Sequence, residues 1–125
     1  MKALLDTHAA VLLADGEAVS FGSASRAVLD DAELLLSPVT RLELEYLFEI
    51  KRISTPPDFV IGALEADLAV RLTEDPISAV IGRAIHIRWT RDVFDRLLVA
   101  TAQLHGARFI TRDRRIRDHF DRAVW

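Results

Sequence analysis

The chain has 125 residues, no cysteine and a formal net charge of −3 at pH 7, and half of its residues are hydrophobic. This length fits one core, so we expect a single domain over residues 1–125. The lack of cysteine excludes disulfides and thiolate metal sites, which suits a cytoplasmic location. The longest apolar run, residues 9–14, is too short to cross a bilayer, and Asp6 interrupts the first apolar run, so we expect neither membrane insertion nor a signal peptide.

Charge is distributed unevenly along the chain. Residues 1–62 contain five basic and ten acidic residues, whereas residues 83–125 contain ten arginines and five acidic residues. Arginine pairs with phosphate through two hydrogen bonds. An acidic half beside an arginine-rich end is typical of a nuclease, which must hold both metal and polyanion. A solvated charged surface is the alternative, and composition does not separate the two.

Apolar runs and helical periodicity alternate along the chain. The pattern predicts strands at residues 2–5, 34–36, 69–73, 108–111 and 123–125, and helices at residues 7–13, 23–30, 40–52, 56–68, 76–85, 94–105 and 113–120. Strands that alternate with helices in this way predict an α/β fold with a mostly parallel sheet.

Two acids follow predicted strands directly. Asp6 comes after the first strand, and Asp113 comes after the strand that ends at Thr111. Ligands of open α/β sheets bind outside the carboxyl ends of the strands, so we expect both acids at one edge. The alternative for each acid is a local role as a helix cap or turn former.

Glu43 lies on an apolar helix face. On a helical wheel it shares a stripe with Tyr46, Leu47 and Ile50, which predicts burial. A buried carboxylate needs a partner. The local alternative is a capping box, in which Thr40 caps the helix and Glu43 is its partner three residues later.

Asp95 repeats this pattern. Leu98, Val99 and Ala102 follow it at helical spacing, so it too lies on an apolar stripe. The local alternative is a role as the N3 partner of an N-cap at Asp92. A helix that precedes a parallel strand begins at the carboxyl edge of the sheet, so Asp95 is expected near the strand-end acids.

Four carboxylates in one pocket require cations, because each carboxylate raises the pKa of its neighbours. Hard divalent ions with oxygen ligands meet this requirement, and such ions activate water for attack on a phosphate ester. We therefore predict metal-assisted phosphodiester hydrolysis. Side chains expected to support the site are Thr7, Thr40, Asp92 and Thr111.

Four segments in this order resemble the motifs of the PIN-domain family, specifically its VapC-like toxin ribonucleases. They read LLDTH at residues 4–8, SPVTRLEL at 37–44, DVFDRLLVA at 92–100 and ITRD at 110–113. The set spans nearly the whole chain. Three departures leave the carboxylates intact and the subfamily open: Val93 where proline is usual, Leu42 where tryptophan is common, and a first helix, residues 9–14, without the tryptophan often found there.

The resemblance implies a three-layer α/β/α sandwich and an endoribonuclease that depends on one or two Mg²⁺ or Mn²⁺ ions. It implies catalytic and metal-binding roles for Asp6, Glu43, Asp95 and Asp113. It also implies a homodimer and a cognate antitoxin protein. Near the last acid, four arginines are predicted to hold RNA, with a solvated helix face as the alternative: Arg112, Arg114, Arg115 and Arg117.

Other functions remain open. A PIN-type nuclease could process RNA outside toxin–antitoxin biology, and a non-catalytic binding module could keep the fold. In an aspartyl-phosphate phosphatase, Asp6 would be the nucleophile. Such phosphatases usually have a second aspartate two residues later, where this chain has His8.

Overall fold

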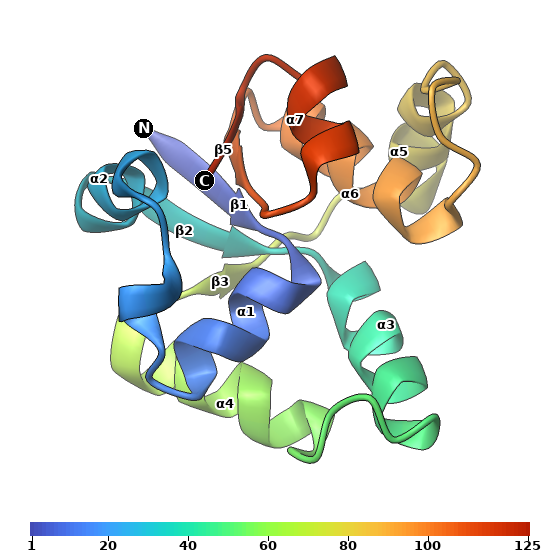
Figure 1. Cartoon of the computed structure of the whole chain (residues 1–125). Coiled ribbons are helices and arrows are strands. Elements are labelled where there is room, and N and C mark those ends of the chain that lie inside the picture. Colours follow the sequence, from blue (N-terminus) through green and yellow to red (C-terminus); the bar gives the residue numbers. More distant parts are fainter.

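A five-stranded sheet forms the centre of the computed structural model, which describes residues 1–125 (Figure 1). Its strands, in the order β3-β2-β1-β4-β5 and all parallel, are β1 (Lys2–Leu5), β2 (Glu33–Leu36), β3 (Arg71–Leu72), β4 (Arg108–Ile110) and β5 (Ala123–Val124). The α/β class is confirmed, and the sheet is wholly parallel.

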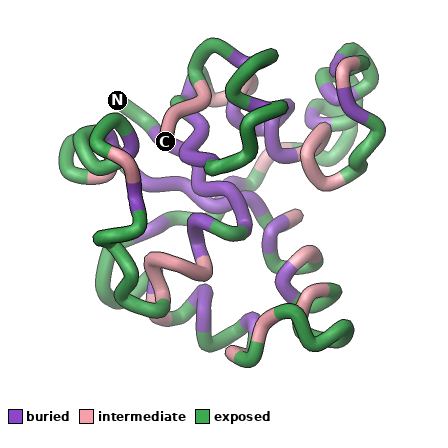
Figure 2. The backbone as a smooth tube through the Cα atoms, in the orientation of Figure 1, coloured by how far each residue is buried: buried purple, intermediate pink, exposed green.

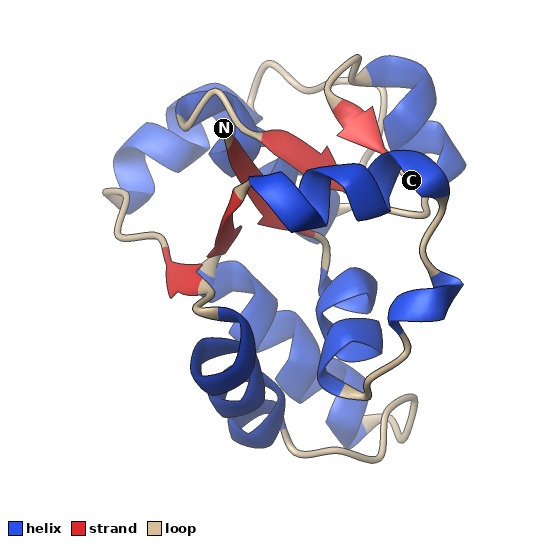
Figure 3. Ribbon diagram, turned by 90° about the vertical axis from the view of Figure 1, so that its left-hand side faces the viewer, coloured by secondary structure: helices blue, strands red, loops and turns tan.

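Helices cover both faces of the sheet (Figures 1 and 3). One apolar cluster joins the sheet to α1, α2 and α4, and a second joins it to α5, α6 and α7. The fold is therefore the predicted three-layer sandwich. The helices are α1 (Thr7–Ala14), α2 (Ser23–Asp31), α3 (Pro38–Glu49), α4 (Pro57–Leu68), α5 (Ile77–Ala84), α6 (Val93–Leu104) and α7 (Arg114–His119), with a 3₁₀ turn, η1, at Ala18–Ser20.

The central strands are buried on both faces, which explains their continuous apolar sequences (Figure 2). In β1, Ala3 and Leu5 join the cluster beneath α1, while Leu4 points into the cluster beneath α6. All three side chains are fully buried. No helix combines the length and the apolar character that a transmembrane span requires.

Helix α3 begins earlier than its sequence predicts. Ser37 is the N-cap, its hydroxyl accepts a hydrogen bond from the Val39 amide, and Pro38 occupies the first helical turn. The capping box predicted at Thr40 and Glu43 is therefore wrong. Glu43 lies in the second turn, so its carboxylate has no capping role.

The stripe predicted around Glu43 is also partly wrong. Tyr46 is 50% exposed and Ile50 is 46% exposed, whereas Leu44 is fully buried. Helix α3 packs on α1, α4 and α6, and Leu44 belongs to the apolar cluster that includes residues of α1 and α4. Glu43 therefore lies at the margin of the buried face, where its carboxylate reaches the edge of the sheet. Strand β3 is likewise shorter than predicted, because only two of its residues pair with β2.

Candidate active site

A polar pocket of about 370 Å³ lies at the carboxyl edge of the sheet. No hydrophobic residue lines it. All four acids singled out by the sequence reach it, so the structure brings them together as predicted. Its lining residues are Asp6, His8, Glu43, Asp92, Asp95, Arg112 and Asp113.

The sheet topology explains this convergence. Strands β1 and β4 are neighbours, with Leu5 paired to Ile110, so the residues after them lie side by side. The Asp6 amide continues this pairing by donating to the Ile110 carbonyl at 3.0 Å. Helix α3 starts after β2 at the same edge. Helix α6 precedes β4 and runs back across the sheet, so its first turn brings Asp92 and Asp95 to this edge.

Asp6 is held by two short hydrogen bonds. Its Oδ1 accepts from the Thr7 amide at 2.7 Å, and its Oδ2 accepts from the Thr111 hydroxyl at 2.6 Å. The Thr111 hydroxyl oxygen also accepts from the Asp113 amide at 3.1 Å. Asp6 is also the N-cap of α1. The local role as a helix cap and the position in the pocket are therefore both present. One threonine thus links the two strand-end acids.

The other acids leave carboxylate oxygens available. Asp92 caps α6 through the Asp95 amide at 3.0 Å, and Asp113 caps α7 through the Ile116 amide at 3.0 Å, each with its Oδ1. The Asp95 carboxylate makes no hydrogen bond or ion pair within the chain. Its predicted stripe is confirmed, because the apolar residues that follow it at helical spacing are fully buried.

Burial and mutual repulsion raise the pKa values of three of these acids. Burial raises the pKa of Asp6. Burial, followed by the charges of Asp6, Asp95 and Asp92, raises the pKa of Glu43 to about 7. Burial, followed by the charges of Asp92, Asp6 and Asp113, raises the pKa of Asp95 to about 7. Burial and the neighbouring carboxylates therefore favour the protonated forms of these three acids when no cation is bound.

The donor set fits a hard divalent cation. Glu43 Oε2 is buried without a hydrogen-bond partner, which is costly unless something else contacts it. The surrounding ligands are carboxylate oxygens, which Mg²⁺ and Mn²⁺ prefer. No three of the acidic or histidine side chains are already grouped as a metal site. Metal binding therefore requires these side chains to close on the ion.

The predicted supporting threonines lie directly behind the acids. Thr7, Thr40 and Thr111 are all buried, and the Thr7 hydroxyl donates to the Thr40 hydroxyl at 3.4 Å. The Thr111 hydroxyl donates to Asp6, and the side chain of Thr7 acts on Glu43, whose pKa it lowers against the larger effect of burial. Asp92, the fourth predicted supporting residue, lines the pocket itself.

The four arginines predicted to hold RNA occupy different positions. Arg112 lines the pocket, and the charge of Arg115 lowers the pKa of Asp95. Arg114 is highly exposed and lies 3.8 Å from Asp118, as the solvated alternative predicts. Arg117 donates to the Arg112 carbonyl at 3.3 Å.

Sequence reasoning missed His8. It lacks any zinc-ligand spacing, but it lines the pocket, and its charge lowers the pKa of Asp6. The signal was its position in the first turn of α1, two residues after a strand-end acid. A side chain there faces the same edge of the sheet as Asp6.

Comparison with known proteins agrees with this geometry. A family model described as "PIN domain" matches residues 3–121. The chain belongs to the PIN-domain family. It is similar to Ribonuclease VapC22 of Mycobacterium tuberculosis, with 33% identity over 118 residues, which cover 93% of this chain and 90% of that protein.

Two solved structures share the PIN-domain fold. One is a toxin–antitoxin complex from Klebsiella pneumoniae, with a TM-score of 0.70, 19% identity, and coverage of 99% of this chain and 97% of that chain. The other is VapBC2 from Rickettsia felis bound to a DNA fragment from their promoter, with a TM-score of 0.68, 14% identity, and coverage of 99% and 96%. Each of the two structural alignments includes nearly the whole chain, and therefore the sheet and its helices.

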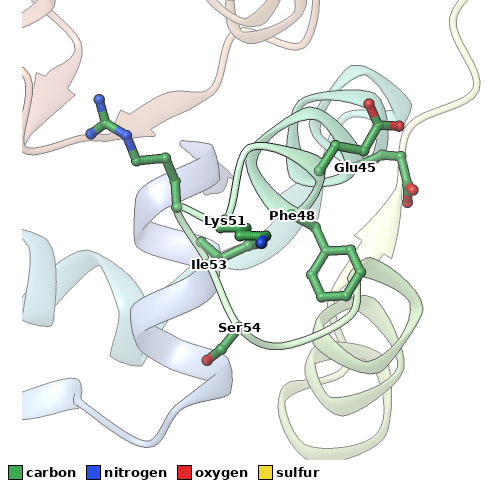
Figure 4. Close-up of a pocket in the computed structure, with 7 residues that line it drawn as sticks. Glu45, Phe48, Lys51, Ile53 and Ser54 are labelled. Carbon is green, nitrogen blue, oxygen red and sulfur yellow. The ribbon is translucent and has the colours of Figure 1, made fainter.

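A larger pocket of this PIN domain, about 670 Å³, lies at the loop after α3 (Figure 4). It is lined by Glu45, Phe48, Glu49, Lys51, Arg52, Ile53 and Ser54. Its acids and bases are mixed, and none of the strand-end acids reaches it. Size therefore does not identify the candidate active site, whereas the concentration of unpaired carboxylates does.

Proposed function

We propose that this PIN domain is an endoribonuclease that hydrolyses RNA phosphodiester bonds with Mg²⁺ or Mn²⁺. The observation that carries the proposal is the convergence of five carboxylates, the four predicted ones and Asp92, on a pocket whose lining includes only one arginine and one histidine. Family membership and the name of the M. tuberculosis relative support the same class of reaction.

Each acid has a distinct part in the proposed site. Asp6, whose two oxygens are fixed by hydrogen bonds, is the rigid ligand. Glu43 offers a buried oxygen without a partner, and Asp95 offers both of its oxygens. Asp113 completes the set with the oxygen that does not cap α7. One or two divalent ions bound there would supply the Lewis acidity that activates water and stabilises charge on the phosphate.

The arginines supply the positive charge that the substrate needs. An acidic pocket repels RNA phosphates, so cations must lie at its rim as well as at its centre. Arg112 and Arg115 are placed for this task, since one lines the pocket and the other acts on an acid within it. RNA phosphates then approach between the acids and α7.

Purified protein incubated with single-stranded RNA tests the activity. Cleavage is expected with Mg²⁺ or Mn²⁺, and none is expected with a chelator or with Asp95→Asn. Asp67→Asn, an exposed change on α4, is the matched control and should cleave normally. Cleavage that persists in the chelator would remove metal from the mechanism.

We further propose that the chain is the toxin of a toxin–antitoxin pair, acts as a homodimer and is silenced by an antitoxin protein. The name of its relative and the toxin–antitoxin structures that share its fold support this role. Expression of the active protein alone should arrest growth, and Asp95→Asn should abolish the arrest. A PIN-type nuclease of RNA processing is the alternative. A gene neighbourhood without an antitoxin reading frame and harmless expression would favour it.

An aspartyl-phosphate phosphatase receives no support from the geometry. Its nucleophile would be Asp6, yet both carboxylate oxygens of Asp6 accept short hydrogen bonds. His8 stands at the position where such an enzyme usually has its second aspartate.

A further inference from the structure

Arg112 lies beside a cluster of carboxylates without pairing with any of them. It lines the acidic pocket, but none of the four ion pairs in the structure includes it. Its guanidinium lies over the ring of Trp125, with the central carbon 5.6 Å from the ring centroid. This contact is a cation–π interaction, which explains how the charge is held away from the acids.

Trp125 is itself fixed from several sides. Its ring stacks on Phe21, which is 2% exposed, at a centroid distance of 4.6 Å and an interplanar angle of 28°. The preceding residue pairs with β4, because the Thr111 amide donates to the Val124 carbonyl at 3.1 Å. This pairing places Trp125 next to the segment that carries Arg112.

Gly22 makes room for this arrangement. A Cβ at this position would lie 2.6 Å from the carbonyl carbon of Trp125 and 2.7 Å from its oxygen. Both contacts are with backbone, which cannot rotate away as a flexible side chain does. Any larger residue at position 22 would therefore displace Trp125.

The position of Arg112 has two consequences for an acidic metal site. A flexible guanidinium near several unpaired carboxylates is drawn toward them by charge and by bidentate hydrogen bonding. Within the pocket it would compete with a metal ion for the same oxygens, and its charge would no longer be available to phosphate. A ring that holds the guanidinium at the rim prevents both effects.

We propose that Trp125 is a positioning residue that keeps Arg112 out of the metal site and presents it to a phosphate of the RNA. The inference rests on the proposed nuclease function and adds to it a specific rim contact. Arg112 is the residue that meets the substrate, and Trp125 acts only through it.

A double-mutant cycle tests this coupling. The variants are Trp125→Leu, Arg112→Ala and the combination of both, with Trp125→Phe as the conservative rescue. RNA affinity is measured by fluorescence anisotropy with Ca²⁺ in place of Mg²⁺, while gel electrophoresis checks that the RNA stays intact. Mn²⁺ affinity is measured by isothermal titration calorimetry, and thermal unfolding checks that each variant is folded.

Trp125→Leu should weaken RNA binding about two- to five-fold, the range expected for one exposed cation–π contact. It should also weaken Mn²⁺ binding, because the released Arg112 then competes for the acids. Arg112→Ala should weaken RNA binding and make its log–log salt slope shallower by about 0.7, the value of one lost phosphate contact. In the Arg112→Ala background, Trp125→Leu should change neither affinity. Trp125→Phe should retain wild-type values.

Gly22→Ala provides an independent perturbation of the same contact. It should reproduce the effects of Trp125→Leu on RNA and Mn²⁺ binding, because the added methyl group displaces Trp125. Gly82→Ala, where a Cβ meets nothing within 4 Å, is the matched control and should leave both affinities unchanged.

Equal effects of Trp125→Leu with and without Arg112 would make Trp125 a packing residue and overturn the inference. This outcome differs from failure of the proposed function, which would appear as wild-type protein that does not cleave RNA with any metal. A wild-type protein that binds neither RNA nor Mn²⁺ would overturn both.

Discussion

The Thr111 hydroxyl donates a 2.6 Å hydrogen bond to Asp6 Oδ2, across a separation of 105 residues in sequence. The same hydroxyl oxygen accepts from the Asp113 amide. One small side chain therefore fixes the rotamer of the most buried acid and the backbone of the next strand-end acid. Groups that orient metal ligands in this way typically affect metal affinity 10–100-fold when they are replaced.

Thr111→Val should weaken Mn²⁺ binding by about 10- to 100-fold while the shape of the core is preserved. The valine leaves Asp6 Oδ2 without its donor, so the carboxylate is less well oriented and less easily ionised. Calorimetric titration with Mn²⁺ measures the effect. Thr111→Ser, which keeps the hydroxyl, is the control and should bind nearly as well as wild type. Equal affinity in all three proteins would confine Thr111 to packing.

Asp95→Asn should abolish RNA cleavage without unfolding the protein. In the metal-free protein its melting temperature should stay level or rise, because a neutral amide removes one of several charges that repel each other. Thermal unfolding in a chelator measures this stability. Asp67→Asn, on the exposed face of α4, should leave both activity and melting temperature unchanged. A large loss of stability in Asp95→Asn alone would assign the carboxylate a structural role.

The metal-free protein should lose stability as pH rises from about 4.5 to about 7. The pKa of Glu43 is raised from 4.5 to about 7, so the folded state binds more protons than the unfolded state within this window. The stabilisation that protonated Glu43 contributes is complete below about pH 4.5 and is lost above about pH 7. Because Glu43 is only partly buried, the discounted loss is about 1 kcal/mol.

Urea unfolding in a chelator at pH 5 and pH 8 measures this dependence. Glu43→Gln should make the difference between the two pH values smaller, since the amide does not titrate. Saturating Mn²⁺ should have the opposite effect, stabilising the protein more at pH 8, because metal binds the ionised carboxylates. A wild-type protein and a Glu43→Gln variant with the same pH profile would contradict the raised pKa.

Arg114→Ala/Arg115→Ala should weaken RNA binding and make the salt dependence shallower by about 1.4 in log–log slope, if both residues neutralise phosphates. Arg26→Ala/Arg83→Ala removes two exposed arginines that do not line the pocket, and it should leave the slope closer to that of wild type. Anisotropy over a range of salt concentrations measures both. An unchanged slope in the first variant would place the RNA-binding surface elsewhere. The exposed ion pair between Arg114 and Asp118 would then belong to a solvated helix face.

Much of the site follows from sequence because its acids occupy topologically determined positions. Asp6 and Asp113 end neighbouring parallel strands, and Asp95 lies in the first turn of a helix that runs back to the sheet. Strand ends and helix starts are readable from apolar runs and capping residues. The parallel topology then brings them to one edge, whatever the details of packing.

Other parts depend on contacts that a single sequence does not encode locally. Thr40 and Glu43 match the spacing of a capping box, but the N-cap of α3 is Ser37, which is followed by a proline in the first turn. Tyr46 belongs to an apolar stripe, yet it is half exposed because the neighbours of α3, which are α1, α4 and α6, cover other parts of its surface more fully. The contact of Arg112 with Trp125 joins two segments whose neighbourhood depends on the pairing of β4 with β5.

Diffraction at the manganese absorption edge, from crystals of the wild-type protein soaked in Mn²⁺, reveals whether the pocket acids hold a metal ion. We predict an anomalous peak within the pocket, at oxygen-ligand distance from Asp6 and Asp95, with the Glu43 carboxylate turned toward it. In Asp95→Asn crystals the peak should weaken or vanish. Manganese bound only outside this pocket, at concentrations that support RNA cleavage, would contradict a metal site built by these acids.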